Sequence, residues 1–156
     1  MQFTHVTNCC VPVPPGEILA QWTAAESLPR HLTHIRAIAA GESGDVARAV
    51  IILEGRHIEF VVQRTMCGSD SVCWQSLGDN FLYVLTVDAR RNASDETAVQ
   101  FTVAYDPPGF LPDVLETCGR GRHFKQAFEQ DIACFKEAML GLNTRLPLVE
   151  PKSAVQ

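Results

Sequence analysis

The stretch LPDVLETCGRGRHFKQAFEQDIACFKEAMLGL, residues 111–142, carries the only long helical pattern in a chain otherwise written mostly in strand periodicity. On a wheel of about 100° per residue, the apolar residues from Phe124 onward share one wide arc. They are Phe124, Ala127, Phe128, Ile132, Phe135, Ala138, Met139 and Leu142. One charged residue, Asp131, falls in the same arc. A single long helix after a run of strands predicts a curved sheet closed by one helix, an architecture that encloses a cavity.

A second apolar stripe precedes the first, and it is formed by Leu111, Val114, Leu115 and Cys118. It is rotated by roughly 100° from the Phe124 stripe on one continuous wheel. Between the stripes lies Gly119-Arg120-Gly121, and each glycine inside a helix costs about 1 kcal/mol relative to alanine. We therefore expect a break or kink there, which would let both stripes face the same core. Residues 143–156 are expected to form a flexible tail.

The rest of the chain predicts short helices and a meander of strands. A first strand over Thr4–Val13 leads to a short helix over Pro15–Thr23, where proline suits the first turn. A second short helix is expected over Ala25–His31, interrupted or ended around Pro29. Strands follow at Ile35–Ala40, Ala47–Glu54, His57–Thr65, Ser71–Leu77, Asn80–Ala89 and Thr97–Tyr105, with tight hairpins at Gly55-Arg56 and Gly78-Asp79. Sequential hairpins imply an antiparallel sheet, so the fold class is α+β, with about seven strands in one domain over residues 1–142.

Composition excludes several classes of protein. The 156 residues carry a net charge of −5 with no basic stripe, which argues against nucleic acid as a main partner. No apolar run reaches membrane-spanning length, and the first residues show no signal-peptide pattern. We therefore expect a cytoplasmic protein.

The cysteines and histidines show no clear pattern for a metal site. Six cysteines stand at positions 9, 10, 67, 73, 118 and 134, a spacing that matches no zinc ribbon or finger. We expect reduced thiols, although Cys67 and Cys73 could approach each other across a hairpin. His31 and His34 are three apart, but no third ligand is evident nearby. Because the chain also lacks a phosphate loop and a dinucleotide fingerprint, we expect neither a metal nor a cofactor.

Six local motifs carry a resemblance to a known family. They are VPVPPGEI at 11–18, Trp22 followed by SLPRHL at 27–32, GRHIEF at 55–60, VCWQS at 72–76, YDPPG at 105–109 and FEQDIACFK at 128–136. With this order of elements, the chain resembles the polyketide cyclase/dehydrase-like members of the START and birch-pollen-allergen type helix-grip superfamily (SRPBCC). The resemblance covers roughly residues 3–141, and its motifs are mostly structural.

The resemblance implies a deep, largely apolar pocket between the curved sheet and the long helix. Members bind polyketides, aromatic molecules, quinones or lipids; some cyclise or dehydrate a polyketide without a cofactor, and others only carry a ligand. The function expected from it is binding of an aromatic or polyketide intermediate and promotion of its cyclisation or dehydration, a lyase- or isomerase-type reaction. The alternative is a non-catalytic carrier of a hydrophobic small molecule. Both a monomer and a homodimer remain open.

Aromatic residues are the candidates for the pocket wall. The ligand-binding candidates are Trp22, Phe60, Trp74, Tyr83, Phe101, Tyr105, Phe124, Phe128 and Phe135. A curved sheet closed by a helix tends to leave a pocket for an apolar ligand, and Trp22 is expected near its mouth. The alternative is that these side chains fill a solid core.

Tyr83, Tyr105 and Asp131 are the candidate catalytic residues. The two phenols could meet an oxygen of a ligand, although a buried tyrosine hydroxyl usually finds a partner within the fold. Asp131 could accept a proton if burial raises its pKa, but we favour a structural ion pair or a hydrogen bond to backbone. His57 and Glu59 share one face of a strand and could form an acid–base pair; we favour a solvated outer face for them, because Ile58, Phe60 and Val62 occupy the inner one.

Overall fold

The computed structural model describes residues 2–53, 56–66, 68–78, 81–106 and 120–145. A seven-stranded antiparallel sheet has the order β1-β7-β6-β5-β4-β3-β2. The strands are β1 (Phe3–Val11), β2 (Ile35–Ala40), β3 (Val46–Leu53), β4 (Arg56–Met66), β5 (Ser71–Ser76), β6 (Leu82–Arg91) and β7 (Thr97–Asp106). The helices are α1 (Pro15–Thr23), the 3₁₀ turn η1 (Ala25–Ser27), α2 (Leu28–His31) and α4 (Arg120–Arg145). The predicted fold class is confirmed.

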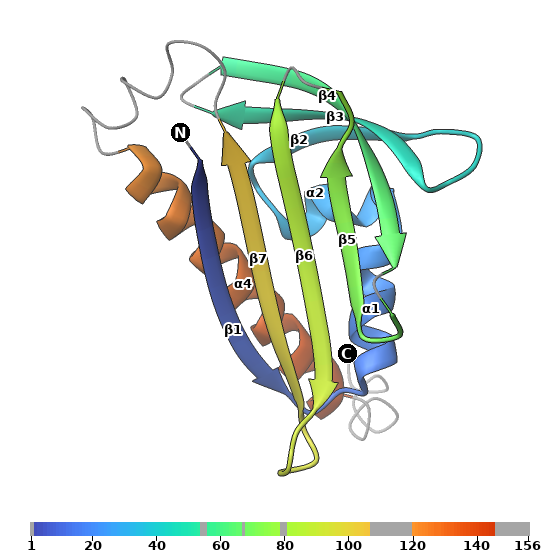
Figure 1. Ribbon diagram of the computed structural model, residues 1–156. Coiled ribbons are helices and arrows are strands. Elements are labelled where there is room, and N and C mark those ends of the chain that lie inside the picture. Colours follow the sequence, from blue (N-terminus) through green and yellow to red (C-terminus); the bar gives the residue numbers. More distant parts are fainter. Residues whose placement is uncertain (1, 54–55, 67, 79–80, 107–119, 146–156) are drawn as a thin grey trace, which may run out of the picture.

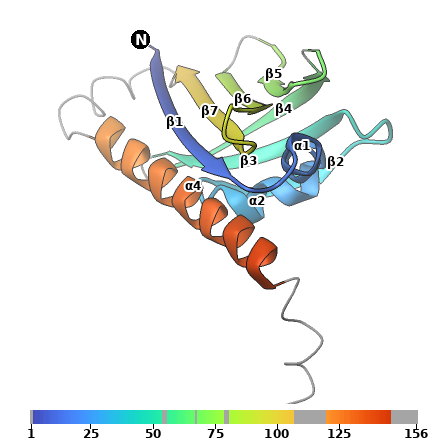
Figure 2. The same cartoon turned by 90° about the horizontal axis from the view of Figure 1, so that it is seen from below.

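The sheet curves around its inner face, and α4 lies across that face (Figures 1 and 2). Alternation decides which side chains point inward, because successive residues of a strand face opposite sides. In β6 and β7 the inward residues are buried and apolar, among them Leu85, Val87, Val99 and Val103. Helix α4 buries Phe128, Ile132, Phe135 and Met139 in the same core, so the predicted apolar arc is the face that closes the sheet.

The long helix differs from the predicted one at both ends. Gly121 lies inside α4, so the described helix runs without a break from Arg120. The rest of the predicted break, Gly119, and the first helical piece, Leu111–Cys118, lie outside the described residues. At the other end, α4 continues to Arg145, so residues 143–145 of the predicted tail are helical. Residues 146–156 lie outside the described residues, and their flexibility stays a prediction.

The short helices follow the sequence prediction. Helix α1 has the predicted bounds and starts at Pro15. The helical stretch over Ala25–His31 is interrupted beside Pro29, as expected; Pro29 lies in the first turn of α2, where its missing N–H would be unpaired in any case. The chain therefore forms two separate short elements, η1 and α2, which bring His31 and His34 toward the inner face.

Candidate functional site

Five rings from four elements meet at one end of the interior. Phe124, early in α4, packs against Tyr105 of β7, His34 just before β2, and His5 of β1, with centroid distances of 4.6, 4.8 and 5.4 Å. Tyr83 of β6 contacts His34 at 5.7 Å and is the register partner of Tyr105. These residues are called the Phe124 cluster below. Predicted candidates Tyr83, Tyr105 and Phe124 thus lie together, with two histidines that the sequence analysis did not include among its site residues.

A buried hydrogen bond joins two members of the Phe124 cluster. His34 Nε2 lies 2.7 Å from the Tyr83 hydroxyl, and both side chains are buried. Burial lowers the pKa of His34 to about 3 and raises the pKa of Tyr83 above its ordinary value, because a low-dielectric interior disfavours both charged forms. At neutral pH the pair is therefore an uncharged imidazole bonded to an uncharged phenol.

The backbone around this pair is fixed on both sides. The carbonyl of His34 accepts a hydrogen bond from the Ile52 N–H at 2.9 Å, and the Tyr83 N–H donates to Ser76 Oγ at 2.9 Å. The sequence singles out His34 only by its spacing from His31 and not as a partner of Tyr83, because it lies in a short connection between α2 and β2 rather than in a periodic segment. Only the folded chain brings it against a tyrosine 49 residues away.

His5 adds a second neutral imidazole to the Phe124 cluster. It is half-buried on the inner face of β1, and its Nε2 has no hydrogen-bond partner among the described residues. Burial lowers its pKa, and the nearby positive charge of Lys125 lowers it further, while Glu129 opposes the shift. His5 is thus an uncharged group that can still exchange a hydrogen bond with a polar atom beside Phe124.

Phe60 and Phe81 extend the cluster toward the end of the sheet. Phe60 contacts Phe81 at 5.1 Å in an edge-on arrangement and contacts Tyr83 at 5.4 Å. Of these two, only Phe60 was a predicted ligand-binding residue. Phe81 occupies the position before β6, where its ring reaches the same interior.

The remaining aromatic candidates form a separate group, the Trp22 cluster, made of Trp22, His31, Phe101 and Phe135. Its ring centroids lie 4.6–5.8 Å apart. The expectation that Trp22 lies at a pocket mouth is wrong, since its side chain is completely buried between α1, β7 and α4. Because aromatic contact of this kind is typical of packed cores, this end of the interior has the solid-core character that was weighed as the alternative.

Trp74 and Phe128 are also buried, but neither belongs to the Phe124 cluster. Trp74 donates its indole N–H to the Trp22 carbonyl at 2.9 Å, and the Arg64 guanidinium lies 5.9 Å from its ring. Arg64 in turn donates to the Thr23 carbonyl at 2.9 Å. Trp74 therefore ties the C-terminal end of α1 to the sheet. Phe128 is part of the apolar face of α4.

Asp131 links α4 to the segment that carries His34. Its Oδ2 accepts hydrogen bonds from the Thr33 N–H at 2.9 Å and from the Thr33 hydroxyl at 3.0 Å. This is the backbone hydrogen bond favoured from the sequence. Burial raises the pKa of Asp131, and the two Thr33 bonds oppose that shift. Since Thr33 directly precedes His34, the carboxylate fixes the position of the neighbouring imidazole.

The other residues that were weighed lie elsewhere. His57 and Glu59 are exposed on the outer face, as favoured, and Glu59 pairs there with Arg48 at 3.3 Å. His31 and His34 belong to different clusters and do not share a site. Cys73 is a free thiol, while Cys67 lies outside the described residues. Within the described part of the chain, no three metal-ligating side chains gather, and no helix is long and apolar enough to cross a membrane.

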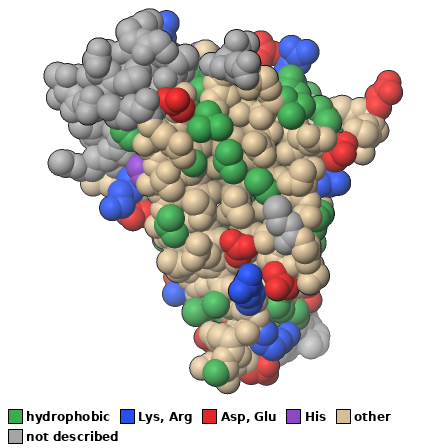
Figure 3. Space-filling model, in the orientation of Figure 1, with side chains coloured by type: hydrophobic (Ala, Val, Ile, Leu, Met, Phe, Trp, Pro, Cys, Tyr) green, Lys and Arg blue, Asp and Glu red, His purple; other side chains and the backbone are tan. Residues whose placement is uncertain are grey.

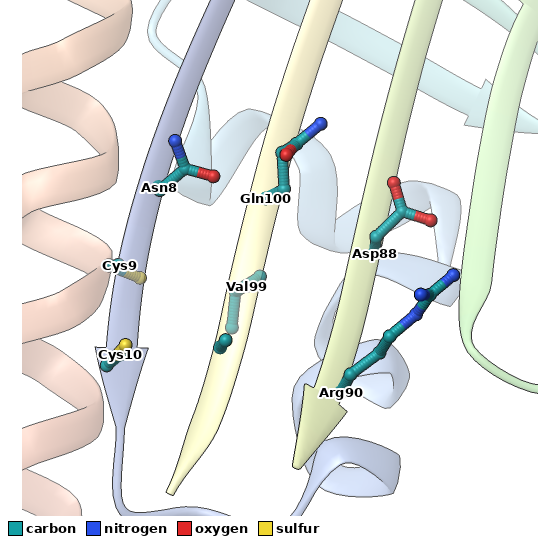
Figure 4. Close-up of a pocket in the computed structure, with 8 residues that line it drawn as sticks. Asn8, Cys9, Cys10, Asp88, Arg90, Val99 and Gln100 are labelled. Carbon is teal, nitrogen blue, oxygen red and sulfur yellow. The ribbon is translucent and has the colours of Figure 1, made fainter. Parts of the chain in front are cut away.

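The outer face of the sheet carries a hollow of its own, with a volume of about 430 Å³. Figure 3 shows this face, on which hydrophobic side chains are scattered and acidic and basic ones gather toward the lower end. Asn8, Gln100 and Asp88 project from the adjacent strands β1, β7 and β6 (Figure 4). Cys10 and Arg90 follow two residues further along β1 and β6. The small Ala98 between the longer side chains leaves the depression. These groups point away from the Phe124 cluster.

Solved structures of other proteins share this architecture. No family model and no curated protein match the chain, but solved structures do. A protein from Deinococcus radiodurans superposes with a TM-score of 0.69 at 19% identity, over 89% of this chain and 99% of its own. A START superfamily protein from Mycobacterium smegmatis gives 0.57 at 15% identity, over 86% and 98%. The chain has the helix-grip fold.

A third match adds an enzyme that shares this fold. The Zhui aromatase/cyclase from Streptomyces sp. R1128 superposes with a TM-score of 0.60 at 15% identity, over 93% of this chain and 95% of its own. At such identities the likeness establishes the helix-grip architecture and not an activity. The chemistry of this helix-grip protein must therefore be argued from its own residues.

Proposed function

We propose that this protein binds a hydrophobic aromatic or polyketide intermediate between the sheet and α4 and promotes its cyclisation or dehydration. The observation that carries the proposal is the buried, uncharged His34–Tyr83 hydrogen bond within the Phe124 cluster. An apolar interior with a few convergent polar groups and shifted pKa values is the usual character of a site for small molecules. Solved helix-grip structures that include an aromatase/cyclase and a START protein support the same class of ligand.

The pair can carry out a dehydration with its protons balanced. His34 Nε2 takes a proton from the carbon next to a substrate carbonyl, and the electrons of that C–H bond form the new double bond. The Tyr83 hydroxyl gives its proton to the departing hydroxyl group, which leaves as water. In the same step, the imidazole passes its proton to the Tyr83 oxygen across their 2.7 Å hydrogen bond. Positioned acid–base groups of this kind contribute about 10²–10⁴-fold to rate.

Burial dictates how the proton transfers are timed. A charged imidazolium or phenolate is costly in this enclosed site, as the lowered pKa of His34 and the raised pKa of Tyr83 indicate. The return of the proton from His34 to the Tyr83 oxygen must therefore be concerted with the other two transfers, so that neither charged form accumulates. Loss of either partner should then cost about as much as loss of both, because the pair acts as a unit.

A ligand must also displace side chains to reach this pair. Phe124 is the ring at the centre of the cluster, and it is only partly buried although three polar rings contact it. We infer that an aromatic ring of the ligand takes its place beside His5, His34 and Tyr105. Holding a flexible chain among these rings would orient its reacting atoms, and such restraint contributes several kcal/mol to ring closure.

Tyr105 and Asp131 take different parts in the proposal. Tyr105 faces Tyr83 across paired strands and contacts Phe124, which places its ring beside the proposed ligand site. Asp131 acts as a positioning residue through Thr33. Trp22, Phe101 and Phe135 pack together at the other end of the interior and take no direct part in the proposal.

A carrier function is the second candidate, and one observation favours it. His34 and Tyr83 satisfy each other's hydrogen-bonding groups, as a purely structural pair would. A carrier of a lipid, quinone or aromatic molecule would need the enclosed site but no proton transfer.

Product analysis with matched variants separates the two functions. Wild-type protein, Tyr83→Phe and Thr102→Val are each incubated with candidate polyketide intermediates, and the products are resolved by mass spectrometry. Thr102→Val removes a hydroxyl from the outer face of β7, so it controls for the substitution itself. The enzyme proposal predicts a rate loss of about 10²–10⁴-fold for Tyr83→Phe and no loss for the control.

Two other outcomes point away from catalysis. Unchanged products together with stoichiometric binding would establish the carrier. Extraction of the purified protein, followed by mass spectrometry, then identifies any molecule that co-purifies. Failure of the wild-type protein to bind any apolar probe would refute both candidates.

A further inference from the structure

The sheet opens between β4 and the strands beside it, close to the Phe124 cluster. β4 pairs with β5 only over Val62–Met66, whereas its pairing with β3 extends to Arg56. Among the described residues, the last backbone bond across the opening is Leu77 N–H to the Val61 carbonyl at 2.8 Å. Figure 1 shows β3 and β4 turning across the top of the sheet, away from β5 and β6. No described strand pairs with β4 on this side over Arg56–Phe60.

A surface hollow of about 250 Å³ lies at this opening. It is lined by Arg48, Glu59, Phe60, Val61, Leu77 and Phe81. Arg48 and Glu59 form an exposed ion pair at 3.3 Å, and Leu77 is an exposed large apolar residue. The hollow thus combines a polar side with apolar lining.

Two lining residues belong to the hollow and to the interior at once. Phe60 and Phe81 line the hollow, and their rings contact each other edge-on at 5.1 Å. The same rings contact Tyr83, at 5.4 Å from Phe60 and 6.4 Å from Phe81. Tyr83 is the hydrogen-bond partner of His34. A path from solvent to the proposed acid–base pair therefore crosses one aromatic contact.

The alternative route through the paired part of the sheet has a different barrier. Strands β5, β6, β7 and β1 are joined by continuous ladders of backbone hydrogen bonds, and a molecule could pass only if several of these bonds broke together. The contact between Phe60 and Phe81 can instead open by side-chain rotation, which occurs far faster than rearrangement of a sheet.

We propose that this hollow is the entrance for the hydrophobic ligand, with Phe60 and Phe81 as the contact that opens. The ligand class is an uncharged aromatic molecule, small enough in one dimension to pass between the two rings. The inference rests on the proposed function, because it assumes that a ligand reaches the Phe124 cluster.

The experiment measures rates of binding as well as affinity. The probe is 2-naphthol, and the signal is its fluorescence change on mixing with the full chain in a stopped-flow instrument. Val61→Phe narrows the hollow from its outer side. Ala98→Phe is the matched control, since it places the same ring in the hollow of Figure 4, on the outer face of β7.

An obstruction of the entrance slows arrival and departure equally and leaves the dissociation constant unchanged. Val61→Phe should therefore lower both rate constants by about tenfold, within the range by which variants of one site differ. Ala98→Phe should change neither. Phe81→Leu, which weakens the aromatic contact, should raise both rate constants.

The outcomes separate this inference from the proposed function. If wild-type protein binds 2-naphthol and both Val61→Phe and Phe81→Leu bind and release it at wild-type rates, the entrance lies elsewhere and only this inference falls. If the wild-type protein binds no 2-naphthol or other neutral aromatic probe, the proposed function falls as well. Thermal melts of each variant establish that it is folded, and Phe81→Leu provides the test if Val61→Phe is not.

Discussion

The His34–Tyr83 pair allows a quantitative prediction from its burial. Tyr83→Phe removes only the hydroxyl and keeps the ring that contacts His34 and Phe60. The imidazole Nε2 of His34 then loses its 2.7 Å partner in an enclosed site. Leaving a buried polar group unsatisfied costs about 1–3 kcal/mol of unfolding free energy. His34→Leu likewise leaves the Tyr83 hydroxyl without its hydrogen-bond partner.

The double variant tests whether these costs come from the same interaction. When both partners are replaced by apolar groups, no polar atom of the pair is left unsatisfied, and the change can be nearly neutral. The loss in the double variant should therefore be smaller than the sum of the two single losses, by about 1–3 kcal/mol. The exposed Arg48–Glu59 pair, with side chains 66% and 57% exposed, provides the control cycle. Its coupling should stay below about 1 kcal/mol.

Urea unfolding measures each of these differences. For a loss of about 2 kcal/mol and a slope of about 2 kcal/mol per molar urea, the midpoint should fall by about 1 M. Slopes must agree between variants, since a changed slope indicates a changed denatured or native state. Additive losses in the His34–Tyr83 cycle would show that the two groups do not depend on each other, and the reasoning about a satisfied buried pair would be refuted.

Three further predictions concern acid, a carboxylate and a turn. The free energy of unfolding should fall as pH drops below about 6.5, because unfolded His34 binds a proton there while folded His34, with its pKa lowered to about 3, does not. For His34 the slope of this free energy against pH can reach about 1.4 kcal/mol per pH unit. The lowered pKa values of His5 and His31 act in the same direction, and the raised pKa of Asp131 acts in the opposite one. Urea midpoints from pH 8 to 4 measure this slope, and a His34→Leu profile as steep as wild type would contradict the assignment. Asp131→Asn keeps an oxygen for Thr33 but loses the charge, so calorimetry should show a loss of about 1 kcal/mol in the free energy of unfolding. Asp131→Leu loses both hydrogen bonds and should cost about 2–3 kcal/mol. Equal losses for the two variants would exclude a hydrogen-bonding role for Asp131. Gly78→Ala should lower the free energy of unfolding by about 1–2 kcal/mol, because Gly78 has a φ of +88°, which strains a residue with a side chain. The added Cβ meets nothing within 4 Å, so backbone strain is the whole expected cost. An unchanged melting temperature would show that the backbone at Gly78 relaxes.

Particular elements show how much of the fold could be predicted from the sequence. Strict alternation in residues 97–105 predicted β7 and its inward set, because a strand has only two faces. Proline at the start of α1 predicted that helix with its bounds. Pro29 predicted the interruption of the next helical stretch, but the sequence did not tell whether this proline ends a helix or lies in the first turn of a new one, which is where the structure has it.

The residues of the candidate site were predicted only in part from the sequence. Tyr83, Tyr105, Phe60 and Phe124 were selected as aromatic residues of an interior, and they meet at one end of it. Trp22 and Phe135 were selected by the same criterion, yet they pack together at the other end. Aromatic character predicts burial, but it does not tell which buried rings become neighbours.

The sequence by itself determined the architecture: one long amphipathic helix, a meander of alternating strands, and two short helices between the first strand and the rest. These are local patterns, set by periods of 3.6 and 2 residues and by the conformational limits of proline and glycine. Only the tertiary structure decided that His34 bonds to Tyr83, that Asp131 holds Thr33, and that Phe60 and Phe81 stand between a hollow and the interior. These contacts join residues far apart in the chain, and their geometry depends on how the sheet curves and where its hydrogen-bond ladders end. For this reason the long helix indicates where a ligand can be enclosed, while the groups that would act on it are selected by the curvature of the sheet.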